Sequence, residues 1–91
     1  QGIIYVDEGA ERAIKSHQSL LPVGVVGVSG HFSKGDVVDI FCGEVRVAKG
    51  TPNYNSDEVE KIKGLHSSRI QDVLGKKKQS DVVLSENLVI L

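Results

Sequence analysis

The sequence of 91 residues has one cysteine, two prolines, no methionine and no tryptophan. The single cysteine, Cys42, excludes an intramolecular disulfide, so we expect a reducing, cytoplasmic location. Because the sequence starts at Gln1 without a methionine, we expect a domain excised from a larger protein. No apolar run approaches the roughly 18 residues that a membrane-spanning helix requires, and no signal peptide is recognisable, which argues against a membrane role.

Aromatic residues make up only 4% of the chain, so Val, Ile and Leu must build the core. This composition favours a sheet over packed helices. Ninety-one residues suit one domain, and 40% hydrophobic with 25% charged residues is ordinary for a globular fold. We therefore predict a single domain over residues 1–91.

Positive charge is not in excess, since 11 basic residues stand against 12 acidic ones. Nucleic-acid binders usually carry a positive excess, because neutralising phosphates supplies much of their affinity. Residues 61–80 are the exception, with a single acid and six basic residues: Lys61, Lys63, Arg69, Lys76, Lys77 and Lys78. This stretch is either a solvated loop or a patch that faces phosphates, and no aromatic residue is interleaved to stack on bases.

The first half of the chain predicts short strands around one helix. Residues 3–6 form a β-branched strand, and Asp7 is suited to cap the helix that follows. Residues 23–28 predict a second strand, and residues 36–42 and 45–49 predict a hairpin that turns at Gly43 and Glu44.

The second half predicts two short helices and two closing strands. A helix begins at Asn55 or Ser56 and ends at Gly64, and a capping box of Ser68 and Gln71 begins another that Gly75 ends. Strands are expected at residues 81–84 and 88–91. About six strands with two or three helices predict a mainly β, α+β fold, a small closed or partly open barrel.

Catalytic patterns are absent or incomplete. Ser29 does not complete the G-x-S-x-G nucleophile motif. Gly30 and Gly35 have the spacing of a phosphate-binding loop, but Asp36 stands where its lysine should be. The three histidines are too far apart in sequence for ligand spacing, and Cys42 ends an alternating strand, so we expect a buried structural thiol. We predict neither catalysis nor a metal site.

The order and spacing of several local signals resemble the PUA domain family, a small mixed pseudo-barrel. Within it, the chain is most similar to the domain at the C-terminal end of bacterial glutamate 5-kinases. The runs that carry the resemblance are Val6-Asp7-Glu8-Gly9-Ala10, Leu20-Leu21-Pro22-Val23-Gly24, Phe32-Ser33-Lys34-Gly35-Asp36, Tyr54-Asn55-Ser56-Asp57-Glu58 and Ile70-Gln71-Asp72-Val73-Leu74-Gly75. The sequence departs from that branch at His17-Gln18, Lys76 and Ser85-Glu86-Asn87.

The resemblance implies a parent enzyme that phosphorylates the γ-carboxylate of glutamate with ATP and Mg²⁺ in proline biosynthesis. Its amino-acid kinase domain would precede Gln1, and the parent would be a homo-oligomer. The present domain, not itself an enzyme, would influence assembly and feedback control by proline. The alternative is an RNA-binding PUA module of an RNA-modification enzyme. By family analogy, its binding face would comprise Gly9, Arg12, Lys15, His17 and Gln18.

Overall fold

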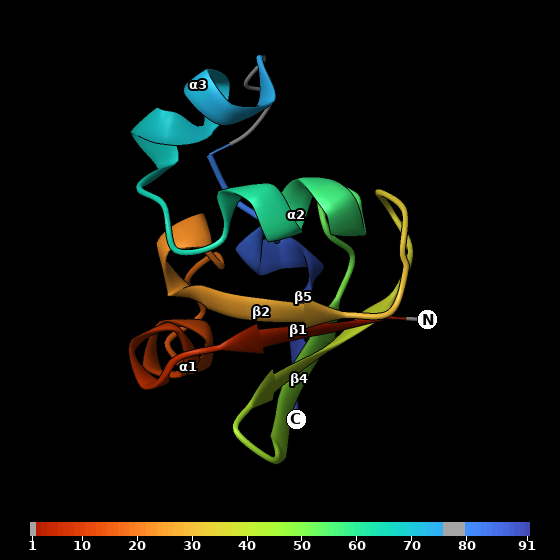
Figure 1. Ribbon diagram of the computed structural model, residues 1–91. Coiled ribbons are helices and arrows are strands. Elements are labelled where there is room, and N and C mark those ends of the chain that lie inside the picture. The colour runs from red at the N-terminus through yellow and green to blue at the C-terminus, as the bar shows by residue number, and fades with distance from the viewer. Residues whose placement is uncertain (1, 76–79) are drawn as a thin grey trace.

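A five-stranded sheet with short helices packed around it forms the domain (Figure 1). The computed structural model describes residues 2–75 and 80–91. Its elements are β1 (Ile3–Val6), α1 (Glu8–Lys15), the 3₁₀ turn η1 (Pro22–Gly24), β2 (Val25–Ser29), β3 (Val38–Cys42), β4 (Val45–Gly50), α2 (Ser56–Ile62), η2 (Ser67–Arg69), α3 (Ile70–Leu74), η3 (Ser85–Asn87) and β5 (Leu88–Ile90).

Strand β1 lies inside the sheet, whose order is β2-β1-β3-β4-β5. It pairs antiparallel with β2 and parallel with β3. The predicted hairpin of β3 and β4 is confirmed, and Gly43 occupies its turn with a φ of 63°, a conformation that favours glycine. The sheet is therefore mixed, and one parallel pair is embedded among antiparallel ones.

Five strands form rather than about six, and the difference lies in residues 81–84. This segment is not a strand, and only Val83 forms a bridge, to Leu20. The Leu20 N–H donates to the Val83 carbonyl over 2.9 Å, and the Val82 N–H donates to the Leu20 carbonyl over 2.7 Å. These bonds join two distant loops outside the sheet ladder, so the pseudo-barrel is closed here by a short seam.

The second strand begins two residues later than predicted. Pro22, Val23 and Gly24 form the 3₁₀ turn η1, and the extended chain of β2 starts at Val25. The Gly24 N–H donates to the Leu21 carbonyl over 3.1 Å, which tightens this turn. The change matters for the surface, because it directs Val23 outward, where 53% of it is exposed.

The core lies on the inner face of the sheet and is built almost entirely from aliphatic side chains, as the composition predicts. Tyr54 and Phe32 are its only large aromatic members, and Tyr54 is 1% exposed. Each fully buried aliphatic side chain stabilises the fold by roughly 1.5–3 kcal/mol. Those larger than alanine with no exposure are Ile4, Ile14, Ile40, Val59, Ile62, Ile70, Val82 and Val83.

Three helix ends test the predicted caps. Asp7 caps α1, and Asn55 caps α2 in a complete capping box with Glu58. The predicted box of Ser68 and Gln71 is wrong. The His66 side chain accepts a hydrogen bond from the Ser68 backbone N–H instead, and η2 leads directly into α3 without a side-chain cap. The ring nitrogen of His66 therefore satisfies the Ser68 backbone N–H, which the Gln71 side chain would have satisfied in the predicted capping box.

Candidate functional site

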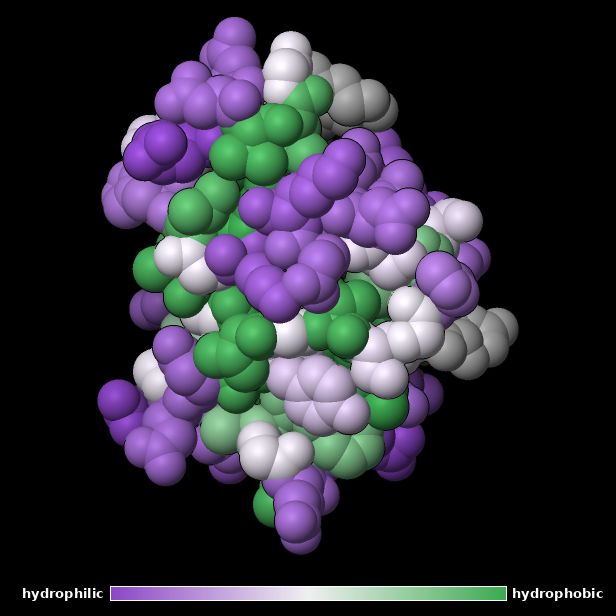
Figure 2. Space-filling model, viewed as in Figure 1, coloured by the Kyte–Doolittle hydropathy of each residue, from purple (hydrophilic) through white to green (hydrophobic). Residues whose placement is uncertain are grey.

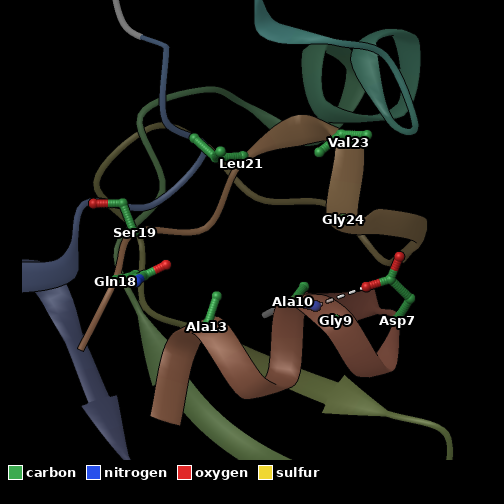
Figure 3. Close-up of a pocket in the computed structure, with 9 residues that line it drawn as sticks. All are labelled: Asp7, Gly9, Ala10, Ala13, Gln18, Ser19, Leu21, Val23 and Gly24. Carbon is green, nitrogen blue, oxygen red and sulfur yellow. Dashed lines mark hydrogen bonds between the residues drawn. The ribbon is translucent and has the colours of Figure 1, made fainter. Parts of the chain in front are cut away.

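A pocket of about 260 Å³ lies between α1 and the segment that leads into η1 (Figure 3). Ala10 and Ala13 on α1 point toward Leu21 and Val23 on the opposite wall. The residues that line the pocket are Asp7, Gly9, Ala10, Ala13, Gln18, Ser19, Leu21, Val23 and Gly24.

Close contact between α1 and η1 fixes one end of this pocket. The Asp7 N–H donates to the Gly24 carbonyl over 3.0 Å, and Asp7 Oδ1 accepts from the Ala10 N–H over 2.7 Å. A Cβ atom at Gly24 would lie 2.6 Å from the Ala10 Cβ, far inside normal contact. Glycine is therefore required at position 24 for this approach of the two backbones.

The pocket is apolar and lacks a cation. Leu21 and Val23 are 42% and 53% exposed, and the alanines of α1 supply the facing wall. Asp7 is the one charged group among the nine lining residues. An acidic, apolar hollow favours a neutral or apolar group and repels a phosphate.

Two of the five residues of the predicted RNA face lie at this pocket. Gly9 and Gln18 line the pocket, but Arg12, Lys15 and His17 do not. Successive residues of an α-helix are 100° apart, which places Lys15 on the side of α1 away from Ala13. Lys15 Nζ lies 3.1 Å from Glu11 Oε2, so its charge is locally paired.

His17 ends the first helix in a left-handed conformation, with a φ of 65°. It is the only non-glycine residue with positive φ among the described residues. The sequence departs from the glutamate 5-kinase branch at this position, and glycine would adopt this backbone without the steric cost that a side chain incurs.

The basic stretch is also largely paired where the structure describes it. Lys63 Nζ forms an ion pair with Glu60, and Arg69 Nε lies 3.2 Å from Asp72 Oδ2. Lys61 is exposed on α2, away from the pocket lining. Three further members of the predicted patch, Lys76, Lys77 and Lys78, lie outside the described residues.

Cys42 is half-buried against the core and lies beside the carboxylate of Glu11. Burial and this carboxylate both raise the pKa of the thiol. The hydrogen bond and charge of Lys15 lower the pKa of Glu11. Cys42 is therefore half-buried rather than buried as predicted, but a thiol with a raised pKa stays protonated at neutral pH and reacts slowly.

Other candidate chemistry can be located in the described part of the chain. The Asp36 carboxylate accepts a hydrogen bond from the Ser33 N–H over 2.8 Å, so it belongs to a turn that Gly35 completes with a φ of 89°. Residues 2–75 and 80–91 contain no group of three or more His, Cys, Asp or Glu side chains placed to hold a metal ion. No helix in these ranges is long and apolar enough to cross a membrane.

Short helices and a short seam between two loops close the small mixed sheet into a pseudo-barrel, and an apolar pocket lies beside the first helix. These features define a class of compact domains. The PUA domain family model matches residues 2–74, and the chain belongs to this family. A solved PUA domain from Aeropyrum pernix K1, in complex with tartrate, is 29% identical and superposes with a TM-score of 0.65 over 91% of this chain and 41% of its own. A PUA domain protein from Thermoplasma acidophilum, 23% identical over 90% of this chain and 46% of its own, has a TM-score of 0.61 and the same fold.

Curated relatives of the chain include glutamate 5-kinases. The one from Methanosarcina mazei is 46% identical over 90 residues, and the one from Aquifex aeolicus is 47% identical over 91. These alignments cover 99% of this chain but 23% and 25% of the relatives, in their C-terminal region. The chain therefore spans about a quarter of the length of the enzymes it matches.

Proposed function

We propose that the chain is the C-terminal assembly and regulatory module of a glutamate 5-kinase and is not itself catalytic. The observation that carries this proposal is the alignment of nearly the whole chain with the C-terminal quarter of enzymes of that name. The remaining three quarters of such enzymes are long enough to hold a complete kinase domain. That domain would bind ATP, Mg²⁺ and glutamate, and the parent would act in the cytoplasm.

The chemistry of the described residues supports a binding role over a catalytic one. The pocket beside α1 combines exposed apolar side chains with one carboxylate, and that carboxylate is committed to capping the helix. The one thiol has a raised pKa, which opposes a nucleophilic role. A surface of this kind is suited to contacts with another protein segment or a neutral ligand.

The test compares the full-length protein, in which this chain would be the C-terminal domain, with a shortened version that lacks residues 1–91. ATP-dependent phosphorylation of glutamate, inhibition by proline and molar mass by light scattering are measured for both. We expect both to phosphorylate glutamate, and we expect the shortened version to differ in molar mass or in proline inhibition.

Two results would contradict the proposal. Loss of activity with an unchanged fold in the shortened version would place catalytic groups in residues 1–91. Unchanged molar mass and unchanged inhibition would remove the assembly and regulatory role. Salt-sensitive binding of structured RNA to residues 1–91 would favour the RNA-binding alternative, which needs phosphate contacts.

A further inference from the structure

The outer face of the sheet carries two aromatic rings on neighbouring strands. Along one register row, Gly27 of β2 pairs with Tyr5 of β1, Tyr5 with Phe41 of β3, and Phe41 with Arg46 of β4. Ile3 stands two residues before Tyr5 and so shares its face. We name Ile3, Tyr5, Gly27, Phe41 and Arg46 the aromatic sheet face.

The two rings lie against each other on the side of the sheet opposite the core. Their centroids are 6.1 Å apart at an interplanar angle of 52°. Tyr5 and Phe41 are half-buried, while Ile4 and Ile40, the inward residues on the same strands, are fully buried. A Cβ at Gly27 would lie 3.9 Å from Tyr5 Cδ2, so the ring borders a position that has no side chain.

No helix lies in front of β1 and β2 in the view of Figure 1, and Figure 2, from the same side, shows apolar surface gathered over these strands. Polar groups border the aromatic sheet face. Arg46 Nη1 lies 3.3 Å from Asp39 Oδ1, and both side chains are about half exposed, at 51% and 41%. Tyrosine, phenylalanine and arginine are the residue types enriched where proteins dock, around a polar rim.

The position of this face in the chain indicates its occupant. Ile3 is the first residue of β1 and belongs to the face, so a preceding chain would enter the domain at the end of a strand that forms this face. In the glutamate 5-kinase relatives, about three quarters of the sequence lies outside the matched C-terminal region. We infer that the aromatic sheet face is the surface on which this domain docks against the preceding kinase region, an inference that rests on the proposed function.

Hydroxyl-radical labelling tests the docking directly, in the full-length protein and in the 91-residue chain. We expect Tyr5 and Phe41 to be labelled at least roughly fivefold more slowly in the full-length protein, as for residues at the centre of an interface. Tyr54, which is 1% exposed in the domain alone, is the internal control and should label equally slowly in both.

A matched pair of variants gives a second, independent measurement. Tyr5→Thr with Phe41→Thr keeps β-forming residues but removes the rings, while Val73→Thr changes an exposed residue of α3, outside both the pocket and the aromatic sheet face. In the full-length protein, limited proteolysis between the kinase region and residue 1 should accelerate roughly 5- to 30-fold for the double variant. Val73→Thr should leave the rate unchanged.

Each alternative outcome is distinct. If the full-length protein phosphorylates glutamate but labels Tyr5 and Phe41 as fast as the 91-residue chain does, the docking inference fails and the proposed function stands. If the full-length protein does not phosphorylate glutamate, the proposed function fails, and with it the basis of the docking inference. Protection that grows with protein concentration would assign the face to a second copy, and protection that needs added single-stranded RNA would assign it to nucleic acid; both overturn the inference.

Discussion

Substitution of Gly24 by alanine should destabilise the domain through a single contact. The new Cβ would lie 2.6 Å from the Ala10 Cβ, and ordinary contact begins near 3.4 Å, so the two backbones must separate by close to an ångström. That separation strains the hydrogen bond from the Asp7 N–H to the Gly24 carbonyl. This substitution therefore tests the close contact between α1 and η1.

The expected magnitude follows from two opposing effects. Overpacking a tight contact costs about 1–3 kcal/mol. Replacing glycine by alanine also restricts the unfolded chain, which returns roughly 0.4–1 kcal/mol, because Gly24 has no positive φ that alanine would find strained. The free energy of unfolding should fall by about 0.5–2.5 kcal/mol, measured by urea denaturation followed by circular dichroism.

Two matched variants separate this contact from a general effect of alanine. At Gly9 an added Cβ would meet only Asp7 Oδ1, at 3.5 Å, so Gly9→Ala should be neutral or stabilise by up to about 1 kcal/mol. Ala10→Gly alone should cost about 1 kcal/mol in helix propensity. Combined with Gly24→Ala, it should cost less than the sum, because it removes the clashing methyl group.

Additivity of the two changes would refute the reasoning, since a double-mutant cycle detects coupling only between residues that interact. A neutral Gly24→Ala would show that η1 yields freely and that the pocket end is not fixed by this contact.

Four other substitutions probe local physical effects. His17→Gly should raise the free energy of unfolding by roughly 0.5–1 kcal/mol, because it relieves the steric strain of a side chain on a left-handed backbone at some entropic cost. Gly35→Ala places a side chain on a backbone with a φ of 89°, so it should lower the free energy of unfolding in the same urea assay. Asn55→Ala should cost about 1 kcal/mol by removing the cap of α2, read from the thermal midpoint; an unchanged midpoint would show that this cap is dispensable. Alkylation of Cys42 by iodoacetamide should become appreciable only above the pH at which ordinary thiols react, because its pKa is raised, and Glu11→Gln should accelerate it by lowering that pKa. Equal rates for the two proteins would exclude an effect of the carboxylate on the thiol.

The sequence predicted best those features whose causes are local. Asp7 and Asn55 cap their helices because a side-chain oxygen reaches a backbone N–H three residues away, which spacing alone reveals. The turn at Gly43 follows from the residues of the hairpin itself. The predicted cap at Ser68 failed for a local reason as well, since His66 offers a competing acceptor two residues earlier.

Features that depend on distant contacts were less predictable. Residues 81–84 have the composition of a strand, but only Val83 finds a strand-like partner, at Leu20. Leu21 and Val23 look like core residues by hydropathy, yet they form an exposed pocket wall because η1 turns them outward. This pocket was therefore not predicted from the sequence, because only the packing of α1 against this segment forms it.

The aromatic sheet face also depends on contacts between residues that are distant in the sequence. Alternation within residues 36–42 correctly separates Phe41 from the inward Ile40. Its neighbour Tyr5 lies 36 positions earlier in sequence, and only the parallel pairing of β1 with β3 brings the two rings together. Strand order is a property of the whole fold, so no local pattern places these residues on one surface.

Charge placement finally bears on which partner this domain can meet. Residues 1–60 hold five basic and nine acidic side chains, and Lys15 is paired on the side of α1 away from the pocket. In residues 61–75, two of the three basic residues form ion pairs with acids three positions away. A polyanion would have to break these pairs to gain its contacts, whereas a protein partner can use the apolar pocket and the aromatic sheet face as they stand. Electrostatics and surface chemistry thus point to the same kind of occupant, another folded protein region.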